Sequence, residues 1–469
     1  MHGPDDAPAT PRPTAAVILA AGDGTRMRSD LPKALHKVGG FPMLAHVMTA
    51  AEALSPERVA VVVGRGGPAV AEQALRARSD ARIVEQTRRL GTGHAARVAL
   101  PALDGFDGDV FILYADSPLL RAETLARMAA SRAAGADVVV LGFEAADPTG
   151  YGRLVLDAAG ALNRIVEHKD ATEDERALTF CNSGVMCVDS AALSRLLPRI
   201  GADNAKGEHY LTDLPELARA DGLTAAAVAC PEAETLGVNS RAELAAAEAA
   251  FQARARDEAM AGGATLVAPE TVFFALDTRL GRDVAIAPNV VFGPGAIVQD
   301  GAEIRAFSHI EGALIAKGAV VGPYARLRPG AVIGESAAVG NFVEVKNATL
   351  GAGAKAGHLT YLGDAEIGER ANIGAGTITC NYDGVLKHRT SIGPDAFIGS
   401  NTALVAPVSV GRGASIGAGS VVTEDVPDDA LALTRAPQDT RARGAARLRR
   451  RLGALKTAKD GGPGPRQED

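Results

Sequence analysis

The chain contains no tryptophan, and aromatic residues make up only 4% of its 469 residues. No stretch approaches the roughly 20 apolar residues that a membrane-spanning helix needs. The first residues, MHGPDDAPATPRP, are polar and proline-rich, without the apolar run of an export signal. The four cysteines lack metal-binding spacing and form no secreted disulfide framework, and a net charge of −7 argues against a nucleic-acid surface. We therefore expect a cytoplasmic protein with reduced thiols and with neither nucleic acid nor membrane as a partner.

What the chain has in abundance is glycine, at 53 residues, within a composition that is 47% hydrophobic and 22% charged. Its length suggests two or three domains with substantial cores. Up to about Asn239, short apolar runs alternate with alanine- and arginine-rich stretches of helical spacing. The runs are Ala15–Leu19, Val59–Val63, Val110–Tyr114 and Val138–Leu141, and the helical stretches include Pro42–Leu54 and Ala122–Ala134. Such alternation predicts an α/β domain with a largely parallel sheet covered on both faces.

Residues 241–263 are interpreted as a linker helix, and after them apolar residues recur at every sixth position, with occasional steps of five. They run through Leu280, Ile286, Phe292, Val298, Ile304, Ile310, Ile315, Val321, Leu327, Ile333, Val339, Val345, Leu350, Ala356, Leu362, Ile367 and Ile373, and resume at Ile392, Ile398, Leu404, Val410, Ile416 and Val422. A hexapeptide repeat is the signature of a parallel β-helix. Its narrow interior has little room for aromatic residues, which accounts for their scarcity.

Two segments stand outside the repeat. TCNYDGVLKHR interrupts it between Ile373 and Ile392, and is too long and polar for an ordinary turn. Loops on solenoids are often functional, although a purely structural excursion remains open. The tail after Arg435 carries a basic run around Arg447–Arg451, for which a solvated helix followed by disorder is a better account than an acidic partner.

The first predicted strand leads into Ala20-Ala21-Gly22-Asp23-Gly24-Thr25-Arg26-Met27 and then Leu31-Pro32-Lys33. Glycines after a strand let backbone N–H groups approach an anion, and Arg26 and Lys33 add positive charge suited to a triphosphate. Glycines alone would more often mark a structural turn, and neither G-x-G-x-x-G nor the GK[ST] ending of a P-loop is present.

The combination L-A-A-G-x-G-T-R-M with L-P-K resembles the signature of sugar-phosphate nucleotidyltransferases, whose Rossmann-like domain joins a nucleoside triphosphate to a sugar 1-phosphate. Further matching segments are Gln86 with LGTGHA, Tyr114-Ala115-Asp116, Gly150-Tyr151-Gly152-Arg153 and Ile165-Val166-Glu167-His168-Lys169. Ala115 and Gly93 depart from the usual Gly and Ala at their positions. The resemblance implies a UTP and UDP-N-acetylglucosamine site made of Leu19, Ala20, Ala21, Gly22, Lys33, Gln86, Gly91, Thr92, Tyr114, Ala115, Asp116, Gly152, Glu167, Asn182 and Asn239, with Arg26 and Lys33 as catalytic cations.

The same resemblance assigns Mg²⁺ to Asp116 and Asn239. The assignment is chemically sensible, since Mg²⁺ prefers hard oxygen ligands and retains several waters. Asp116 also follows an apolar strand, at the carboxyl end where open α/β sheets bind ligands. An aspartate in that place is otherwise most often a turn residue or a helix cap.

In the repeat domain, YARLRPG, GNFVEVK, KAGHLTYLGD, IGAGT and CNYDG closely resemble the bifunctional N-acetylglucosamine-1-phosphate uridylyltransferase and glucosamine-1-phosphate acetyltransferase family. The resemblance extends from about Ala15 to Arg435 and implies a left-handed β-helix. It implies His358 as the base that deprotonates the attacking amine, a role suited to imidazole. A β-helical carbonic anhydrase is improbable, because only His309, His358 and His388 occur in this half and their placement is irregular.

The family further implies that Arg328, Lys346, Tyr361 and Asn372 bind glucosamine 1-phosphate. Acetyl-CoA is assigned to Ala375, Asn381, Tyr382, Ser400, Ala418 and Arg435. For the cationic pair Arg328 and Lys346, a solvated face of the solenoid is the alternative explanation. Members of this family form homotrimers that hold acetyl-CoA between neighbouring subunits, so a homotrimer is expected by resemblance.

We thus expect a flexible extension over 1–14, a uridylyltransferase domain over 15–240, a linker helix over 241–263, an acetyltransferase β-helix over 264–440 and a basic, largely disordered tail over 441–469. The enzyme would acetylate glucosamine 1-phosphate from acetyl-CoA, then transfer UMP from UTP, and its product would feed cell-wall and lipopolysaccharide synthesis. Two alternatives stay open. One is a monofunctional nucleotidyltransferase with a regulatory β-helix, and the other is a non-enzymatic scaffold attached to a sugar-nucleotide sensor.

Overall fold

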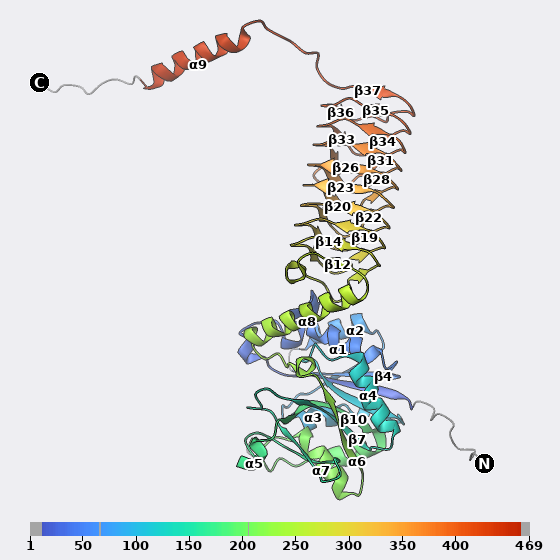
Figure 1. Ribbon diagram of the computed structural model, residues 1–469, viewed down its shortest axis with the longest axis vertical. Helices are drawn as coiled ribbons and strands as arrows, with labels where there is room; N and C mark the ends of the chain where they lie inside the picture. Colours follow the sequence, from blue (N-terminus) through green and yellow to red (C-terminus); the bar gives the residue numbers. More distant parts are fainter. Residues whose placement is uncertain (1–11, 65–66, 205, 461–469) are drawn as a thin grey trace, which may run out of the picture.

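The computed structural model describes residues 12–64, 67–204 and 206–460. An α/β domain occupies one end, helix α8 (Arg241–Ala261) crosses beneath a tall prism of short strands, and helix α9 (Gly444–Asp460) projects to the side (Figure 1). Among the helices of the described residues, none is both long and apolar enough to cross a membrane.

The α/β domain is built on a nine-stranded sheet in the order β11-β7-β10-β6-β1-β4-β5, with β8 and β9 attached beside β10. Its strands are β1 (Thr14–Ala20), β4 (Arg58–Val63), β5 (Arg82–Glu85), β6 (Asp109–Tyr114), β7 (Val138–Glu144), β8 (Arg153–Leu156), β9 (Leu162–Val166), β10 (Phe180–Asp189) and β11 (Ala225–Cys230). Its helices are α1 (Met43–Glu52), α2 (Pro68–Ala77), α3 (Thr92–Val98), α4 (Ala122–Ala133), α5 (Glu173–Arg176), α6 (Ser190–Leu196) and α7 (Leu214–Ala220), and a small hairpin joins β2 (Lys37–Val38) to β3 (Phe41–Pro42). Apolar side chains on the two faces form separate buried cores.

The expected parallel sheet is interrupted by one inverted strand. β10 runs antiparallel to both of its neighbours, β6 and β7. A parallel strand would need a crossover back to the opposite edge of the sheet. Between β7 and β10, however, the chain forms only the β8–β9 hairpin and the single turn α5, and Phe180 therefore enters the sheet opposite Glu144, where β7 ended. The inversion keeps that hairpin at the carboxyl edge of β6.

The prism consists of three parallel sheets, which we call the first, second and third faces. The first face holds β12 (Thr265–Leu266), β14 (Ala285–Ile286), β17 (Glu303–Ile304), β20 (Val320–Val321), β23 (Ala338–Asn341), β26 (Lys355–His358), β29 (Asn372–Ile373), β32 (Phe397–Ile398), β35 (Ser415–Ile416) and β37 (Leu431–Ala432). The second holds β15 (Val291–Phe292), β18 (His309–Ile310), β21 (Arg326–Leu327), β24 (Glu344–Lys346), β27 (Tyr361–Gly363), β30 (Ile378–Cys380), β33 (Ala403–Val405) and β36 (Val421–Val422). The third holds β13 (Arg279–Leu280), β16 (Ile297–Val298), β19 (Ala313–Ile315), β22 (Ala331–Ile333), β25 (Thr349–Leu350), β28 (Ala365–Ile367), β31 (Thr390–Ile392) and β34 (Val408–Val410).

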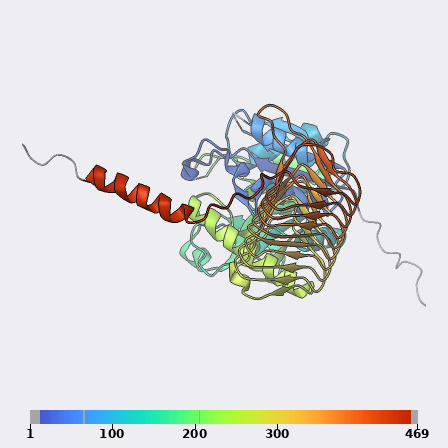
Figure 2. The same ribbon diagram turned by 90° about the horizontal axis from the view of Figure 1, so that it is seen from above.

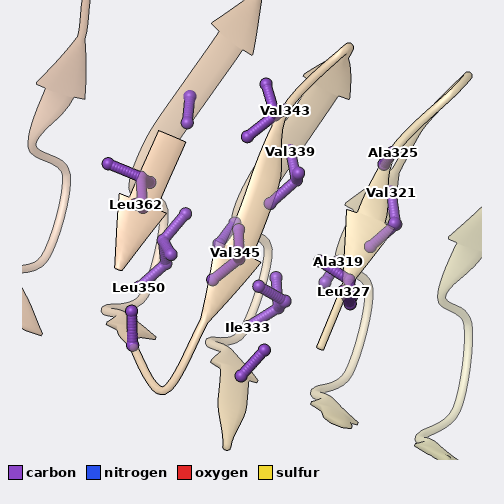
Figure 3. Packing of buried hydrophobic residues seen from close by; sticks show 14 of the residues in the cluster. Ala319, Val321, Ala325, Leu327, Ile333, Val339, Val343, Val345, Leu350 and Leu362 are labelled. Atoms are coloured by element: carbon purple, nitrogen blue, oxygen red, sulfur yellow. The ribbon is translucent and has the colours of Figure 1, made fainter. Parts of the chain in front are cut away.

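Apart from β12–β14 and β35–β37 at the ends of the first face, each strand pairs with the one three further along, so three strands make one coil of a left-handed parallel β-helix, and the coils stack on one another (Figure 2). The hexad residues point inward and are buried, except Leu280, which is partly buried at the end of the prism (Figure 3). Alanines such as Ala319 and Ala325 precede Val321 and Leu327 by two positions and are also buried. The inward positions are therefore filled mostly by aliphatic side chains, and Phe274 and Phe292, stacked near the first coils, are the buried aromatic residues of this core.

The helices at the two ends of the prism agree with the sequence-based predictions to different extents. α8 has the bounds that its alanine-rich composition predicts, with Ser240 capping the amide of Glu243. In the tail, Gly444–Asp460 is helical, which agrees with the helix expected around Arg447–Arg451 and shortens the disorder expected over 441–469. Alanine, leucine, arginine and lysine have high helix propensity and account for this. The flexibility expected for 1–11 and the disorder expected for 461–469 lie outside the described residues.

Candidate functional sites

Eleven of the residues assigned to UTP and its product line one cavity of about 300 Å³ at the carboxyl ends of β1 and β6. They are Leu19, Ala20, Ala21, Gly22, Lys33, Gln86, Gly91, Thr92, Tyr114, Ala115 and Asp116. β1 and β6 are adjacent and parallel, so the segments that follow them emerge at the same edge. The structure therefore brings together residues up to about 100 positions apart in the sequence.

A cation bridges the two residues assigned to the metal. Lys33 Nζ contacts Asp116 Oδ2 and donates a hydrogen bond of 2.9 Å to Asn239 Oδ1. Asn239 is held there because Val238 donates its amide to the carbonyl of Asp116 and Glu243 accepts the amide of Asn239. A carboxylate and an amide oxygen thus converge on one positively charged group, which is the donor set that Mg²⁺ prefers. The described residues contain no cluster of three or more His, Cys, Asp or Glu side chains suited to a metal.

The residues assigned to the sugar form a second group beside this cavity. The backbone N–H of Asn182 donates a hydrogen bond to the backbone carbonyl of Gly152. A Cβ atom on Gly152 would lie 3.6 Å from Glu167 Oε1. Glu167 accepts a hydrogen bond of 3.3 Å from Thr212, and burial raises the pKa of its carboxyl group. The β8–β9 hairpin and the inverted strand β10 supply all three residues. The inversion of β10, which sequence patterns did not predict, therefore brings these three residues together.

Tyr114 connects the two groups. Tyr114 and Thr92 line the same cavity, and burial raises the pKa of the Tyr114 phenol well above its usual value, with the charges of Asp116 and Glu167 acting in the same direction. Thr92 in turn accepts the amide of Leu211, and Gly91 adopts φ 108° where a Cβ atom would lie 2.4 Å from the carbonyl oxygen of His209. Segment 208–213 therefore packs closely against the glycine turn. Sequence reasoning missed its residues Glu208, which lines the cavity, and Thr212.

Arg26 is the one assigned cation that does not line this cavity. It lies exposed on a turn of 3₁₀ helix, Thr25–Met27, which is anchored by buried Met27. Arg241, at the start of α8, donates a hydrogen bond of 3.2 Å to the carbonyl oxygen of Met27. The loop that carries Arg26 is therefore tied to the helix that follows Asn239.

In the prism, His358 and most residues assigned to acetyl-CoA lie along one corner, where the chain turns from the first face to the second; we call it the first corner. Asn341 pairs with His358 in the sheet, and the ladder continues so that Ala375, Ser400 and Ala418 follow the paired residues Ile373, Ile398 and Ile416. Arg435 donates a hydrogen bond of 2.6 Å to the carbonyl oxygen of Ala418. The parallel ladder thus places residues from successive coils on one continuous edge, even though the coil with the interrupting loop is longer.

His358 has a specific neighbour that sequence reasoning missed. Its Nδ1 lies 2.6 Å from Oδ1 of Asn341, one coil earlier. An amide oxygen only accepts hydrogen bonds, so Nδ1 must carry the proton and Nε2 is left with its lone pair. The ring is exposed, which leaves Nε2 accessible to a substrate. The spacing of one coil between Asn341 and His358 is the signal by which the sequence could have revealed this pair.

A cationic cluster lies at the second corner, between the second and third faces. Arg328 follows the second-face strand β21 and pairs its charge with Glu344 at 2.8 Å, and Lys346 ends β24 one coil later. The neighbouring ammonium of Lys387 lowers the pKa of Lys346. Lys387, in the loop that interrupts the repeat, was not among the predicted residues. Three cations in one place form a suitable site for a phosphate.

The interrupting loop folds back onto this cluster. Asn381 donates to Asp364, which also accepts from Asn347 at 2.6 Å. Burial alone would raise the pKa of Asp364, but these hydrogen bonds lower it. Within the loop, His388 pairs with Asp383 at 2.7 Å and Tyr382 donates to the carbonyl of Gly384. The loop is therefore an ordered part of the site.

Tyr361 and Asn372, both assigned to glucosamine 1-phosphate, do not lie together within one chain. Tyr361 points outward from the second face, between the two corners, whereas Asn372 points outward from the first face. The described side chain of Asn372 has no hydrogen bond to the cationic cluster.

The two sites together define the class of protein. A nucleotide-binding α/β domain and a hexapeptide-repeat prism with an exposed histidine are the parts of a transferase with two separate centres. The MobA-like NTP transferase domain family matches residues 16–179, and the bacterial transferase hexapeptide family matches 389–424.

Comparison with whole proteins gives the family. The chain is 58% identical to the bifunctional protein GlmU of Jannaschia sp. (strain CCS1) over 96% of this chain and 99% of that protein. It is 59% identical to the bifunctional protein GlmU of Paracoccus denitrificans (strain Pd 1222), over 94% and 98%. The chain belongs to the GlmU family. It is a bifunctional transferase of UDP-N-acetylglucosamine synthesis, an acetyltransferase and a uridylyltransferase, as the sequence motifs indicated.

Proposed function

We propose that the two centres act in sequence through the residues described above, at the domain boundaries given by the sequence. The prism acetylates glucosamine 1-phosphate, and the cavity of the α/β domain joins the acetylated product to UMP. The observation that carries the proposal is that eleven of the fifteen residues assigned to the nucleotide line a single cavity. The substrates, UTP and acetyl-CoA, favour the cytoplasm as the location.

In the acetyl transfer, His358 Nε2 accepts the proton of the attacking amine while Asn341 holds the proton on Nδ1. The amine nitrogen forms a bond to the thioester carbonyl carbon, the carbon–sulfur bond breaks, and the sulfur leaves as CoA. Arg328, Lys346 and Lys387 bind the phosphate, with Tyr361 and Asn372 as further polar contacts. Acetyl-CoA lies along the first corner over Ala375, Ser400 and Ala418, with Asn381, Tyr382 and Arg435 beside it.

In the uridylyl transfer, a phosphate oxygen of N-acetylglucosamine 1-phosphate attacks the α-phosphorus of UTP and pyrophosphate leaves. Gln86, Gly91 and Thr92 hold the uracil end, and Gly152, Glu167 and Asn182 hold the sugar. Lys33 and Arg26 neutralise the charge that develops on the phosphates. Asp116 and Asn239 would hold Mg²⁺, which when bound supplies further charge neutralisation at the phosphates.

We propose that the chain assembles as a homotrimer. Phe307, Tyr324 and Phe342 stack on successive coils of the first corner, with centroids 4.8 and 5.3 Å apart, and remain about half exposed at 50%, 47% and 55%. Exposed apolar columns of this kind usually mark contact surfaces. The column continues directly into Leu359, beside His358. A second chain packed on this corner would cover the apolar column. It would also bring Asn372 of one chain toward Tyr361 of the other.

A paired assay of the wild type, His358→Ala and Asp116→Ala tests the division of labour. It follows CoA release from acetyl-CoA with glucosamine 1-phosphate, and pyrophosphate release from UTP with N-acetylglucosamine 1-phosphate. We expect each variant to lose one activity and keep the other. If the wild type releases pyrophosphate but never CoA, the prism is not an acetyltransferase and the alternative of a regulatory β-helix is favoured.

A further inference from the structure

Asp23 and Arg89 face each other at the mouth of the nucleotide cavity. Asp23 lies between Gly22 and Gly24 after β1, and Arg89 lies between Gln86 and Gly91. The guanidinium of Arg89 contacts Asp23 Oδ2, and the two side chains are 38% and 52% exposed. The pair joins two segments that the proposed nucleotide site uses for its phosphates and its base.

Arg89 also stands between two cavities. It lines the nucleotide cavity and an adjoining polar recess of about 290 Å³, which share Ala20, Ala21 and Gly22 in their walls. The recess continues past Asp23, Asp30 and Pro32. The guanidinium therefore lies where a chain of phosphates would pass from one cavity into the other.

The charges explain why an arginine is needed there. With the uracil near Gln86 and the α-phosphate near Lys33, the β- and γ-phosphates of UTP would extend along the glycine turn, toward the negative charge of Asp23. A carboxylate beside a polyphosphate is repulsive, and Arg89 offsets it. Arginine also binds phosphate in a bidentate manner. An exposed ion pair contributes little to stability, so exchanging its partner costs little.

We propose that Arg89 is a phosphate-binding residue of the uridylyl site whose guanidinium passes from Asp23 to the β- and γ-phosphates of UTP, and stays with pyrophosphate until it is released. The inference rests on the proposed function of the α/β domain. It adds a cation that no motif of the sequence indicated.

The test measures KM for UTP and the inhibition constant of pyrophosphate for Arg89→Gln, with Arg88→Gln as the matched control. Arg88 is the neighbouring exposed arginine and takes part in no ion pair among the described residues. We expect Arg89→Gln to raise both constants about tenfold, the loss of one charged hydrogen bond, with Arg89→Lys intermediate. KM for the sugar phosphate and the acetyl transfer of the same chain should not change. Arg88→Gln should stay within about twofold of the wild type.

Asp23→Asn removes the competing partner, so KM for UTP should fall or stay equal. Two results would overturn the inference. One is an Arg89→Gln enzyme with the KM for UTP of the control, which would make the contact a surface ion pair. The other is an Asp23→Asn enzyme that needs more Mg²⁺, which would make Asp23 a metal ligand. A wild type without pyrophosphate release would contradict the proposed function itself.

Discussion

His358 Nδ1 and Asn341 Oδ1 lie 2.6 Å apart, on adjacent coils that pair in the same sheet. The contact sets the tautomer of the imidazole, because the amide oxygen can only accept. It places the basic nitrogen on the exposed side of the ring. A rigid ladder of backbone hydrogen bonds, rather than a loop, therefore orients the proposed base.

Replacing Asn341 with alanine should lower kcat for acetyl transfer about tenfold without changing KM for glucosamine 1-phosphate. The ring loses its orientation and preferred tautomer but keeps its basic nitrogen. His358→Ala should lower kcat by about 10²–10⁴, the usual contribution of a general base. CoA release measures both effects, and pyrophosphate release by the same samples controls for folding. Equal losses in the two variants would show that Asn341 does more than orient the ring.

Lys387→Ala should raise KM for glucosamine 1-phosphate about tenfold, since it removes one charge from the cluster with Arg328 and Lys346. The pKa of Lys346 is lowered by Lys387, so the variant should also let Lys346 bind protons more strongly. Lys317→Ala, an exposed lysine elsewhere on the prism, is the control. An unchanged KM in Lys387→Ala would exclude the loop lysine from the phosphate site.

Asp213→Asn should stabilise the α/β domain at neutral pH. Burial and the nearby carboxylates of Glu216 and Glu167 raise the pKa of Asp213 from 3.8 to about 6. The folded state therefore holds a proton that the unfolded state releases between these values, and stability falls as the pH rises from about 4 to 6. Asparagine removes this penalty, which we put at about 1 kcal/mol for a partly exposed group.

Thermal unfolding of the full chain measures this effect. The transition of the α/β domain should rise by about 2–4 °C at pH 7 and should not change at pH 4. Asp221→Asn is the matched control. The ion pair with Arg199 lowers the pKa of Asp221, so its removal should give no gain at pH 7. A gain at both pH values in Asp213→Asn would rule out titration as the cause.

Tyr324→Asp should dissociate the proposed trimer into monomers of 48.0 kDa. Tyr324 is exposed and has φ 54°, a conformation that aspartate tolerates, so the coil itself should remain intact. Light scattering after size exclusion measures the mass, and Tyr324→Phe should remain trimeric. Acetyl transfer should fall at least tenfold and uridylyl transfer should persist. A fully active monomer would show that one chain completes the acetyl site.

Much of the fold could be predicted because its signals are local. A spacing of six, with a few steps of five, identified the prism, and the buried hexad residues from Ile286 to Val422 confirm its register. The repeat was lost at one coil because Thr379, a polar residue, takes the inward position and bonds to the carbonyl of Gly363. Ile367 pairs with Ile392 whereas Ile392 pairs with Val410, so the loop adds seven residues to this coil.

The residues that sequence reasoning missed are those whose neighbours lie far away in the chain. Lys387 belongs to the site because it lies next to Lys346, and Thr212 because it donates a hydrogen bond to Glu167. Only the folded chain creates these contacts. The inverted strand β10 could not be predicted either. Its apolar pattern is the same in either direction, and only the path of the preceding hairpin determines which edge it enters from.

The amino-acid sequence by itself determined the two kinds of domain, their order and the family to which the chain belongs. These depend on periodicity and on motifs, which are properties of neighbouring residues. The tertiary structure decided which distant side chains meet: Lys33 between Asp116 and Asn239, Arg89 against Asp23, and Asn341 beneath His358. Sheet order and coil length determine these contacts, because they set which residues share an edge or a corner.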